Sequence, residues 1–304
     1  MAYGYFPGCS LKSSAKEYDL TVRAMAERFG VQLEEIGNWN CCGSTPAYAV
    51  SGEISLALPW NNLAQAEAQG LDKVLSPCPA CHSHMSESHA VASGDRRLAA
   101  RLDELCETSY GGKLELFHLL DFLHQEIGLD AIRAKVTHPL AGMRAACYYG
   151  CLTRMHALHV DDVELPVKME QVVEACGGQA VDYSHRTECC GGSLVLSKID
   201  TALRLSNEIL EAAGRAGANC AVVVCPVCHG NLDMRQKAIE KKYKKRHRLP
   251  VLYLSQVVLL SQGVGAKALG FKKHFVKPGA LLETVYTPIE EPKKKKKKKP
   301  AAGA

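Results

Sequence analysis

A cysteine pattern that occurs twice constrains this chain more than any other feature of its 304 residues. In each copy one cysteine is followed by an adjacent pair of cysteines and then by a CxxC motif. The copies lie about 145 residues apart, which indicates an internal duplication of most of the chain. The cysteines of the two copies, in chain order, are Cys9, Cys41, Cys42, Cys78, Cys81, Cys151, Cys189, Cys190, Cys225 and Cys228.

Residues beside the cysteines repeat as well. Gly43 and Gly191 each follow an adjacent pair, and His82 and His229 each follow a CxxC motif. Glycine lets the backbone approach a bulky group closely and turn its N–H toward anionic sulfur. The duplication therefore includes the surroundings of the thiols as well as the thiols themselves.

Short apolar runs alternate with stretches of helical periodicity in both halves. Residues 73–78 and 220–225 read as buried strands that lead into the CxxC motifs, while residues 15–30 and 165–178 favour helices. This alternation predicts an α/β fold with a parallel sheet in each half. We expect two duplicated Rossmann-like lobes related by a pseudo-twofold axis. The cysteines then fall at the carboxyl ends of strands, where open α/β sheets bind ligands.

The duplication also sets the expected domains, with residues 1–140 as the first cysteine-rich domain and residues 141–290 as the second. Residues 291–304 are expected to form a disordered tail, because seven consecutive lysines fill positions 293–299. This tail accounts for the net charge of +5, so the remaining chain gives no electrostatic case for nucleic-acid binding. Docking of the tail to an acidic partner or an anionic membrane surface stays open.

The composition also predicts a compartment. The first residues lack the basic and apolar regions of a secretory signal, and no apolar stretch reaches transmembrane length. We therefore expect a cytoplasmic protein. Fourteen cysteines in a reducing compartment favour metal or redox chemistry over structural disulfides.

Five cysteines per half exceed the needs of common metal sites. A structural zinc ion and a cubane iron–sulfur cluster each take four ligands. Either one cysteine in each five is spare, or the bound group is not an ordinary cube. A thioredoxin-like dithiol would leave three cysteines unexplained. The sequences CPACH and CPVCH fit c-type haem attachment, but that usually requires export and leaves the adjacent pairs without a role.

The complete set of cysteines, at these spacings, resembles the B subunit of heterodisulfide reductase over about residues 1–262. The resemblance implies two non-cubane 4Fe-4S clusters, each held by all five cysteines of one CCG motif. It also implies a disulfide bound between the clusters, whose sulfurs engage iron as the bond is split. In related CCG proteins of lactate utilisation and of glycerol-3-phosphate dehydrogenase one copy is often degenerate, whereas both copies are complete here.

On this resemblance the chain is the catalytic subunit of a heterodisulfide-reductase-like complex, which reduces or forms a disulfide in two one-electron steps. The implied partners are a ferredoxin-like subunit with two ordinary 4Fe-4S clusters and a flavoprotein, since the chain has no flavin or nicotinamide fingerprint. Two alternatives stay open. One is a sulfur-oxidising complex that acts on sulfane or lipoate-bound sulfur, and the other is a pure electron-transfer subunit that serves a membrane quinone partner.

Other cysteines and histidines carry weaker expectations. His82 and His229 should lie at the start of the helix after each CxxC motif, where a role beside the cluster or in proton delivery is a hypothesis. Cysteines without a counterpart in the other half are interpreted as small buried hydrophobes. These are Cys106, Cys147, Cys176 and Cys220, of which Cys147 aligns with Tyr5 and Cys220 with Lys73.

Overall fold

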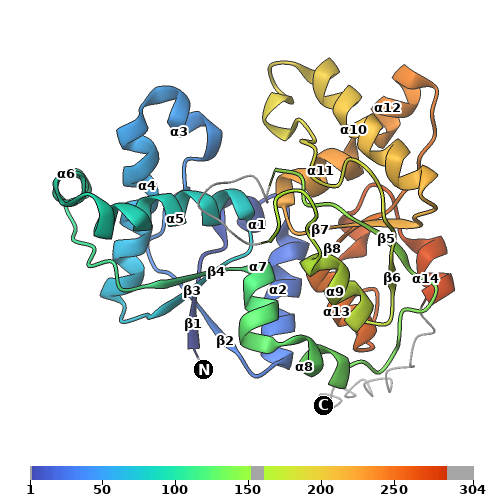
Figure 1. Cartoon of the computed structure of the whole chain (residues 1–304), viewed down its shortest axis with the longest axis horizontal. Coiled ribbons are helices and arrows are strands. Elements are labelled where there is room, and N and C mark those ends of the chain that lie inside the picture. Colours follow the sequence, from blue (N-terminus) through green and yellow to red (C-terminus); the bar gives the residue numbers. More distant parts are fainter. Residues whose placement is uncertain (1, 152–160, 286–304) are drawn as a thin grey trace, which may run out of the picture.

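The computed structural model describes residues 2–151 and 161–285, and each half of the chain forms its own parallel sheet (Figure 1). The strand order is β2-β1-β3-β4 in the first sheet and β6-β5-β7-β8 in the second. This common order confirms the predicted α/β class and the duplication of the lobes. The strands are β1 (Ala2–Tyr5), β2 (Gln32–Glu35), β3 (Lys73–Ser76), β4 (Glu115–His118), β5 (Arg144–Cys147), β6 (Gln179–Ala180), β7 (Cys220–Val223) and β8 (Val251–Tyr253).

Helices connect the strands in both lobes. Those of the first lobe are α1 (Gly8–Lys12), α2 (Lys16–Arg28), α3 (Ser44–Val50), α4 (Gly52–Ala68), α5 (Pro79–Gly94), α6 (Arg96–Cys106), α7 (Leu119–Asp121), the π-helix η1 (Phe122–Ile127) and α8 (Leu129–Ala134). Those of the second lobe are α9 (Lys168–Ala175), η3 (Gly192–Leu194), α10 (Ile199–Arg215), α11 (Pro226–Met234), α12 (Gln236–Tyr243), α13 (Leu254–Ser261), η4 (Phe271–Lys273) and α14 (Gly279–Val285). The expected domain boundary at 140 and 141 falls between α8 and β5.

Each CxxC motif opens a helix, as the sequence predicts. Pro79 begins α5 directly after Cys78, and Pro226 begins α11 directly after Cys225. Proline suits the first position of a helix, because its fixed φ is already helical and its missing N–H would have no partner there. The motif thus turns the chain from a strand into a helix at the point where its thiols stand.

The first sheet buries both of its faces. Val74 of β3 contributes to a core with Trp60 and Leu63 of α4. Leu75, the next residue, belongs to a second core that continues through the whole second lobe and includes Tyr253. Successive strand residues point to opposite faces, so a strand covered on both sides must be apolar throughout. This explains why the apolar residues Val74 and Leu75 follow one another directly in the run 73–78.

Helices pack against one another across the lobe boundary: α2 against α13, and α8 against α9 (Figure 1). In the first contact the Tyr18 ring stacks on Tyr253 with centroids 4.1 Å apart. Beside the second, Lys168 Nζ of α9 lies 2.8 Å from Asp121 Oδ1 of α7. Helices α2 and α9 both follow the first strand of their lobe, while α13 and the helical run α7–η1–α8 both follow the fourth. The two contacts are therefore equivalent after exchange of the lobes, as a pseudo-twofold axis requires.

The remaining cysteines mostly occupy buried positions. Cys147 on β5, Cys176 after α9 and Cys220 on β7 are fully buried, which confirms that expectation, whereas Cys106 at the end of α6 is half-buried. Among the described residues no helix is both long and apolar enough to cross a membrane. The predicted lysine-rich tail, residues 291–304, lies outside the described residues.

Candidate functional site

The first five cysteines meet at the carboxyl edge of the first sheet. Cys41 and Cys42 follow β2, Cys78 follows β3, and Cys81 lies in the first turn of α5. The Sγ atoms of Cys42 and Cys81 are 3.4 Å apart, and those of Cys41 and Cys9 are 3.9 Å apart. The structure thus brings the single cysteine, the adjacent pair and the CxxC motif together.

The second five cysteines form the corresponding group in the second lobe. The Sγ atoms of Cys190 and Cys228 are 3.7 Å apart. The backbone N–H of Gly191 donates to Cys189 Sγ at 3.3 Å. Partial burial of the sulfur and then the neighbouring thiols Cys189 and Cys190 raise the pKa of Cys151 to about 11, so the single cysteine lies beside the pair here too.

Each group has an exposed rim and a buried floor. The single cysteine and the first member of the adjacent pair are exposed, while the second member and both CxxC cysteines are buried. A group bound on these thiols would be fixed from below by packed side chains and remain accessible from outside. The rim consists of Cys9, Cys41, Cys151 and Cys189.

The glycine after each adjacent pair is required by the backbone. Gly43 has a φ of 85° and Gly191 a φ of 72°, in the left-handed region that L side chains rarely adopt. A Cβ at Gly43 would lie 2.6 Å from Ala47 Cβ, and one at Gly191 would lie 3.0 Å from Ala202 Cα. The resulting turn aims the N–H of Gly43 at the thiol of Cys41. A preorganised N–H of this kind stabilises negative charge on sulfur.

In each group the second cysteine of the adjacent pair is shifted toward the thiolate form, whereas the pKa of its CxxC donor, Cys81 or Cys228, is raised. A hydrogen bond from Cys81 lowers the pKa of Cys42. A hydrogen bond from Cys228 lowers the pKa of Cys190 to about 7, with help from the backbone N–H of Gly192. The thiolate is the form that binds metals. The two lobes therefore favour ligation at the same position, the second cysteine of the pair.

The two groups also touch across the lobe interface. The neighbouring thiol of Cys225 is the first cause that holds the pKa of Cys78 well below its ordinary value. Tyr18 Oη lies 2.7 Å from the carbonyl oxygen of Val224 and 3.2 Å from that of Pro77. In Figure 1, α1 of the first lobe lies beside α11 of the second. The two CxxC loops therefore face one another.

The two histidines that follow the CxxC motifs lie where the sequence predicts, in the first turns of α5 and α11, and both are buried. Burial lowers the pKa of His82 to about 3, and it also lowers the pKa of His229. The His82 ring lies 5.8 Å from that of His118, whereas His229 stacks on Tyr253 at 4.2 Å. Both imidazoles are therefore neutral at physiological pH, and a role in proton delivery stays a prediction.

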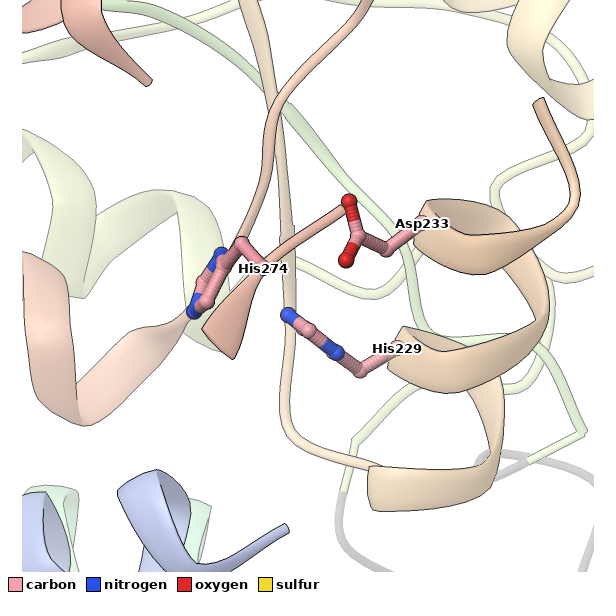
Figure 2. A group of neighbouring side chains, drawn as sticks. All are labelled: His229, Asp233 and His274. Atoms are coloured by element: carbon pink, nitrogen blue, oxygen red, sulfur yellow. The ribbon is translucent and has the colours of Figure 1, made fainter. Parts of the chain in front are cut away.

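A further buried polar group was missed by sequence reasoning. His229 and Asp233 project from α11 toward His274, and their candidate ligand atoms all lie within 4.8 Å of one another (Figure 2). The spacing of His229 and Asp233, one helical turn, is a signal in the sequence, but nothing there connects His274 with them. Nε2 of His274 accepts a hydrogen bond from the Gln256 amide at 3.0 Å.

Protein groups already occupy most of the other ligand atoms of this cluster, although the buried Nδ1 of His274 has no hydrogen-bond partner within the described part of the chain. Nε2 of His229 lies 3.0 Å from the carbonyl oxygen of Val251. The Asp233 carboxylate accepts the N–H groups of Phe275 and Val276 at 2.6 and 2.8 Å. A metal ion would have to displace these hydrogen bonds. We therefore interpret the cluster as a polar clamp that holds the segment after η4 on α11.

The thiol groups, in contrast, suit iron–sulfur clusters. Anionic sulfur ligands with nearby N–H donors are the usual surroundings of such clusters. The backbone at Gly8 passes close to Cys81 Sγ. A Cβ added at this glycine would lie only 2.9 Å from that sulfur. Either five-cysteine group could hold one cluster.

Comparison with known proteins gives the same two segments. The cysteine-rich CCG domain matches residues 3–86 and residues 145–233. All the cysteines of the two groups lie inside these matches. The duplication inferred from the cysteine spacing is thus a duplication of one known domain.

Several curated proteins are similar over most of the chain. The 8-methylmenaquinol:fumarate reductase membrane anchor subunit of Wolinella succinogenes is 33% identical over 279 residues, which cover 90% of this chain and 96% of that protein. The B subunit of the ferredoxin:CoB–CoM heterodisulfide reductase of Methanosarcina mazei is 26% identical over 289 residues, with 92% and 96% covered. A protein of Archaeoglobus profundus that is named as similar to the heterodisulfide reductase B subunit is 26% identical over 273 residues, with 86% and 90% covered.

One solved structure shares the fold. The crystal structure of a hypothetical protein from Helicobacter pylori superposes with a TM-score of 0.73 at 13% sequence identity. The match covers 91% of this chain and 52% of that one, so the chain spans about half the length of that protein. At this identity the likeness establishes the architecture alone.

Proposed function

The chain belongs to the cysteine-rich CCG family, with two complete copies of the domain, and from this we propose that it is the iron–sulfur redox subunit of a heterodisulfide-reductase-like complex. In this proposal the five cysteines of each lobe hold one non-cubane 4Fe-4S cluster. A disulfide binds between the lobes and is reduced to two thiols in two one-electron steps. The similarity to B subunits of heterodisulfide reductases over most of the chain supports this assignment.

The observation that carries the proposal is the contact between the two cysteine groups. The Cys225 thiol of the second lobe is close enough to Cys78 of the first to lower its pKa, and Tyr18 Oη bonds to the carbonyls directly before both cysteines. Two complete donor sets around one shared surface suit a reaction in which two centres act on one small molecule. The exposed rims of both groups leave room for that molecule to enter.

Reduction of a disulfide consumes two electrons and two protons and yields two thiols. When bound, the clusters would supply electrons singly and an iron site for each sulfur. The chain itself holds the thiol ligands and keeps N–H groups near Cys41 and Cys189, where negative charge gathers. Its electrons come from outside, and the proposed donors are a ferredoxin-like subunit with two clusters and a flavoprotein beyond it.

Metal analysis is the first test. Protein purified without oxygen should contain roughly eight iron atoms and a similar amount of acid-labile sulfide. Its spectrum should show broad charge-transfer absorption. A sharp haem Soret band, or about two zinc ions and no iron, would contradict the proposal.

Turnover is the second test. The reduced protein should reduce a low-molecular-weight disulfide when a low-potential chemical donor is present. Full cluster content without any disulfide reduction would favour the second candidate function, an electron-transfer subunit.

That second candidate rests on one observation. The relative that is 33% identical is named as part of an 8-methylmenaquinol:fumarate reductase, so its complex oxidises a quinol. In this alternative the two clusters pass electrons between a quinone-reactive membrane partner and a soluble reductase, and no disulfide is bound. Reduction of the clusters by a quinol analogue in the presence of such a partner would support it.

A further inference from the structure

An aromatic column crosses the interface between the lobes. The Tyr18 ring, fully buried on α2, stacks on Tyr253 of the second lobe at 4.1 Å and an interplanar angle of 4°. Tyr253 in turn stacks on His229 at 4.2 Å and 13°. His229, which is held by the polar clamp in Figure 2, directly follows Cys228. The column therefore connects a helix of the first lobe with the CxxC helix of the second.

The Tyr18 hydroxyl continues this connection to both CxxC loops. Its oxygen lies 2.7 Å from the carbonyl oxygen of Val224 and 3.2 Å from that of Pro77. These carbonyls belong to the residues immediately before Cys225 and Cys78. A phenol has one hydrogen, so the shorter bond to Val224 takes most of it and the Pro77 carbonyl shares the remainder. One side chain thus contacts the backbone of both loops at the same sequence position, one residue before the first cysteine of each CxxC motif.

The position of the ring is fixed independently of the hydroxyl. Thr21 Oγ1, on the same helix, lies 2.8 Å from Ser255 Oγ of α13. At the end of the helix, Arg28 Nε donates to Gln262 at 2.7 Å. With α2 held on α13 at these two points, the Tyr18 hydroxyl cannot follow one loop away from the other.

We infer that Tyr18 is a positioning residue that sets the separation of the two CxxC loops, and through them the separation of the two metal centres. The inference deepens the proposed function and rests on it, because it takes both loops as cluster ligands. The sulfur atoms of a disulfide are only about 2 Å apart. Two centres that act on both sulfurs must therefore be held at one spacing, and an error of about 1 Å in such a geometry can cost roughly a hundredfold in rate.

Tyr18→Phe tests the inference, because it keeps the ring stack and removes only the hydroxyl. The control is Tyr183→Phe, since Tyr183 is also buried but donates to a carbonyl of its own lobe, that of Cys147, at 3.1 Å. Three readouts apply to the anaerobically loaded full chain: iron content, the spin–spin interaction between the two reduced clusters in pulsed EPR, and amide hydrogen exchange.

For Tyr18→Phe we expect full iron content, a weakened and broadened spin–spin interaction, and faster amide exchange in residues 78–82 and 225–229. Disulfide turnover should fall by roughly tenfold to a hundredfold. Tyr183→Phe should leave the spin–spin interaction as in the unaltered chain. A rescue variant carries 4-aminophenylalanine at position 18, whose two N–H hydrogens can serve both carbonyls and should restore the interaction. This variant also serves as the test if Tyr18→Phe does not accumulate as folded protein.

The inference is overturned if Tyr18→Phe keeps the spin–spin interaction and the exchange rates of the unaltered chain, or if 4-aminophenylalanine fails to restore them. Failure of the proposed function looks different. In that case the unaltered chain itself shows no disulfide turnover, while the cluster separation still depends on Tyr18.

Discussion

The two lobes hold the same thiols on different supports. Between the adjacent cysteines and the CxxC motif, the first lobe places α3 and α4, while the second places η3 and α10. Behind the CxxC motif, His82 faces His118, whose buried Nε2 has no hydrogen-bond partner within the described part of the chain. His229 instead bonds to Val251 and packs against His274. In the proposed function, ligation of a cluster fixes the spacing of the thiols, but it leaves the polar groups around them free to differ.

This difference affects what each centre can do. Reduction potentials of iron–sulfur clusters depend on hydrogen bonds and buried polar groups near the sulfurs. Because those groups differ between the lobes, we expect two separate reduction potentials rather than one. The following variants test which properties the two lobes share and which differ between them.

The largest effect should come from loss of one ligand in either lobe. Cys42→Ser and Cys190→Ser should each lower iron content by about half and leave the EPR signal of the other lobe. Disulfide turnover should disappear in both variants, since a single centre can take only one of the two sulfurs. Iron analysis and an activity assay with a low-potential donor measure this. Substantial disulfide turnover in Cys190→Ser would mean that the cluster of the first lobe is sufficient for the reaction and that the two-centre mechanism is wrong.

Gly43→Ala and Gly191→Ala should destabilise the protein, because each forces a side chain into the left-handed region at roughly 1–2 kcal/mol and adds a steric clash. The effect should be larger at Gly43, where the added Cβ would lie 2.6 Å from the Cβ of Ala47, an atom that no rotamer change can move, than at Gly191, where the nearest atom is 3.0 Å away. Chemical unfolding under anaerobic conditions measures the difference. Gly214→Ala on α10, where an added Cβ meets nothing within 4 Å, is the matched control and should be slightly stabilising.

His274→Gln should flatten the acid side of the pH–stability profile. Burial lowers the pKa of His274 from its ordinary 6.5 to about 4. Below pH 6.5 the unfolded chain takes up a proton that the folded chain does not, so stability falls by about 1.4 kcal/mol per pH unit as the pH drops toward 4. The glutamine variant should lack this part of the slope, as unfolding free energies between pH 7 and 4.5 would reveal. An unchanged slope would mean that the imidazole is charged in the folded protein.

The smallest effect is expected at Cys106, a half-buried thiol outside both groups. Its sulfur donates to the carbonyl of Ala57 at 3.3 Å, a bond that a serine hydroxyl can also make. Cys106→Ser should leave iron content unchanged and alter the unfolding free energy by less than about 0.5 kcal/mol. A loss of iron in this variant would make Cys106 a cluster ligand and would contradict the assignment of the ligands to the two repeated five-cysteine groups.

Much of this arrangement could be predicted because it is local or repeated. The parallel sheet in each half, the helices that begin at Pro79 and Pro226, and the two thiol groups follow from apolar periodicity and from a spacing that occurs twice. Tyr18 and His274 could not be found in this way. Tyr18 acts on Val224, more than two hundred residues away, and His274 reaches Asp233 from a segment with no repeated partner. Such contacts depend on how packed helices orient their side chains toward distant parts of the chain. The hydrophobic periodicity of a sequence contains no information on that orientation.

The contacts of α2 with α13 and of α9 with α8 are related by the pseudo-twofold axis. They resemble the contacts of an isologous dimer, but here both partners belong to one chain. A lobe alone would expose both helix faces and would need a second copy of itself to cover them. Fusion makes that pairing independent of concentration, because the copies are tethered. It also removes a constraint of homodimers, in which every substitution appears twice. The ring beside His82 is a histidine, His118, whereas the ring beside His229 is a tyrosine, Tyr253. Such a difference between the two copies is possible only because one chain encodes both.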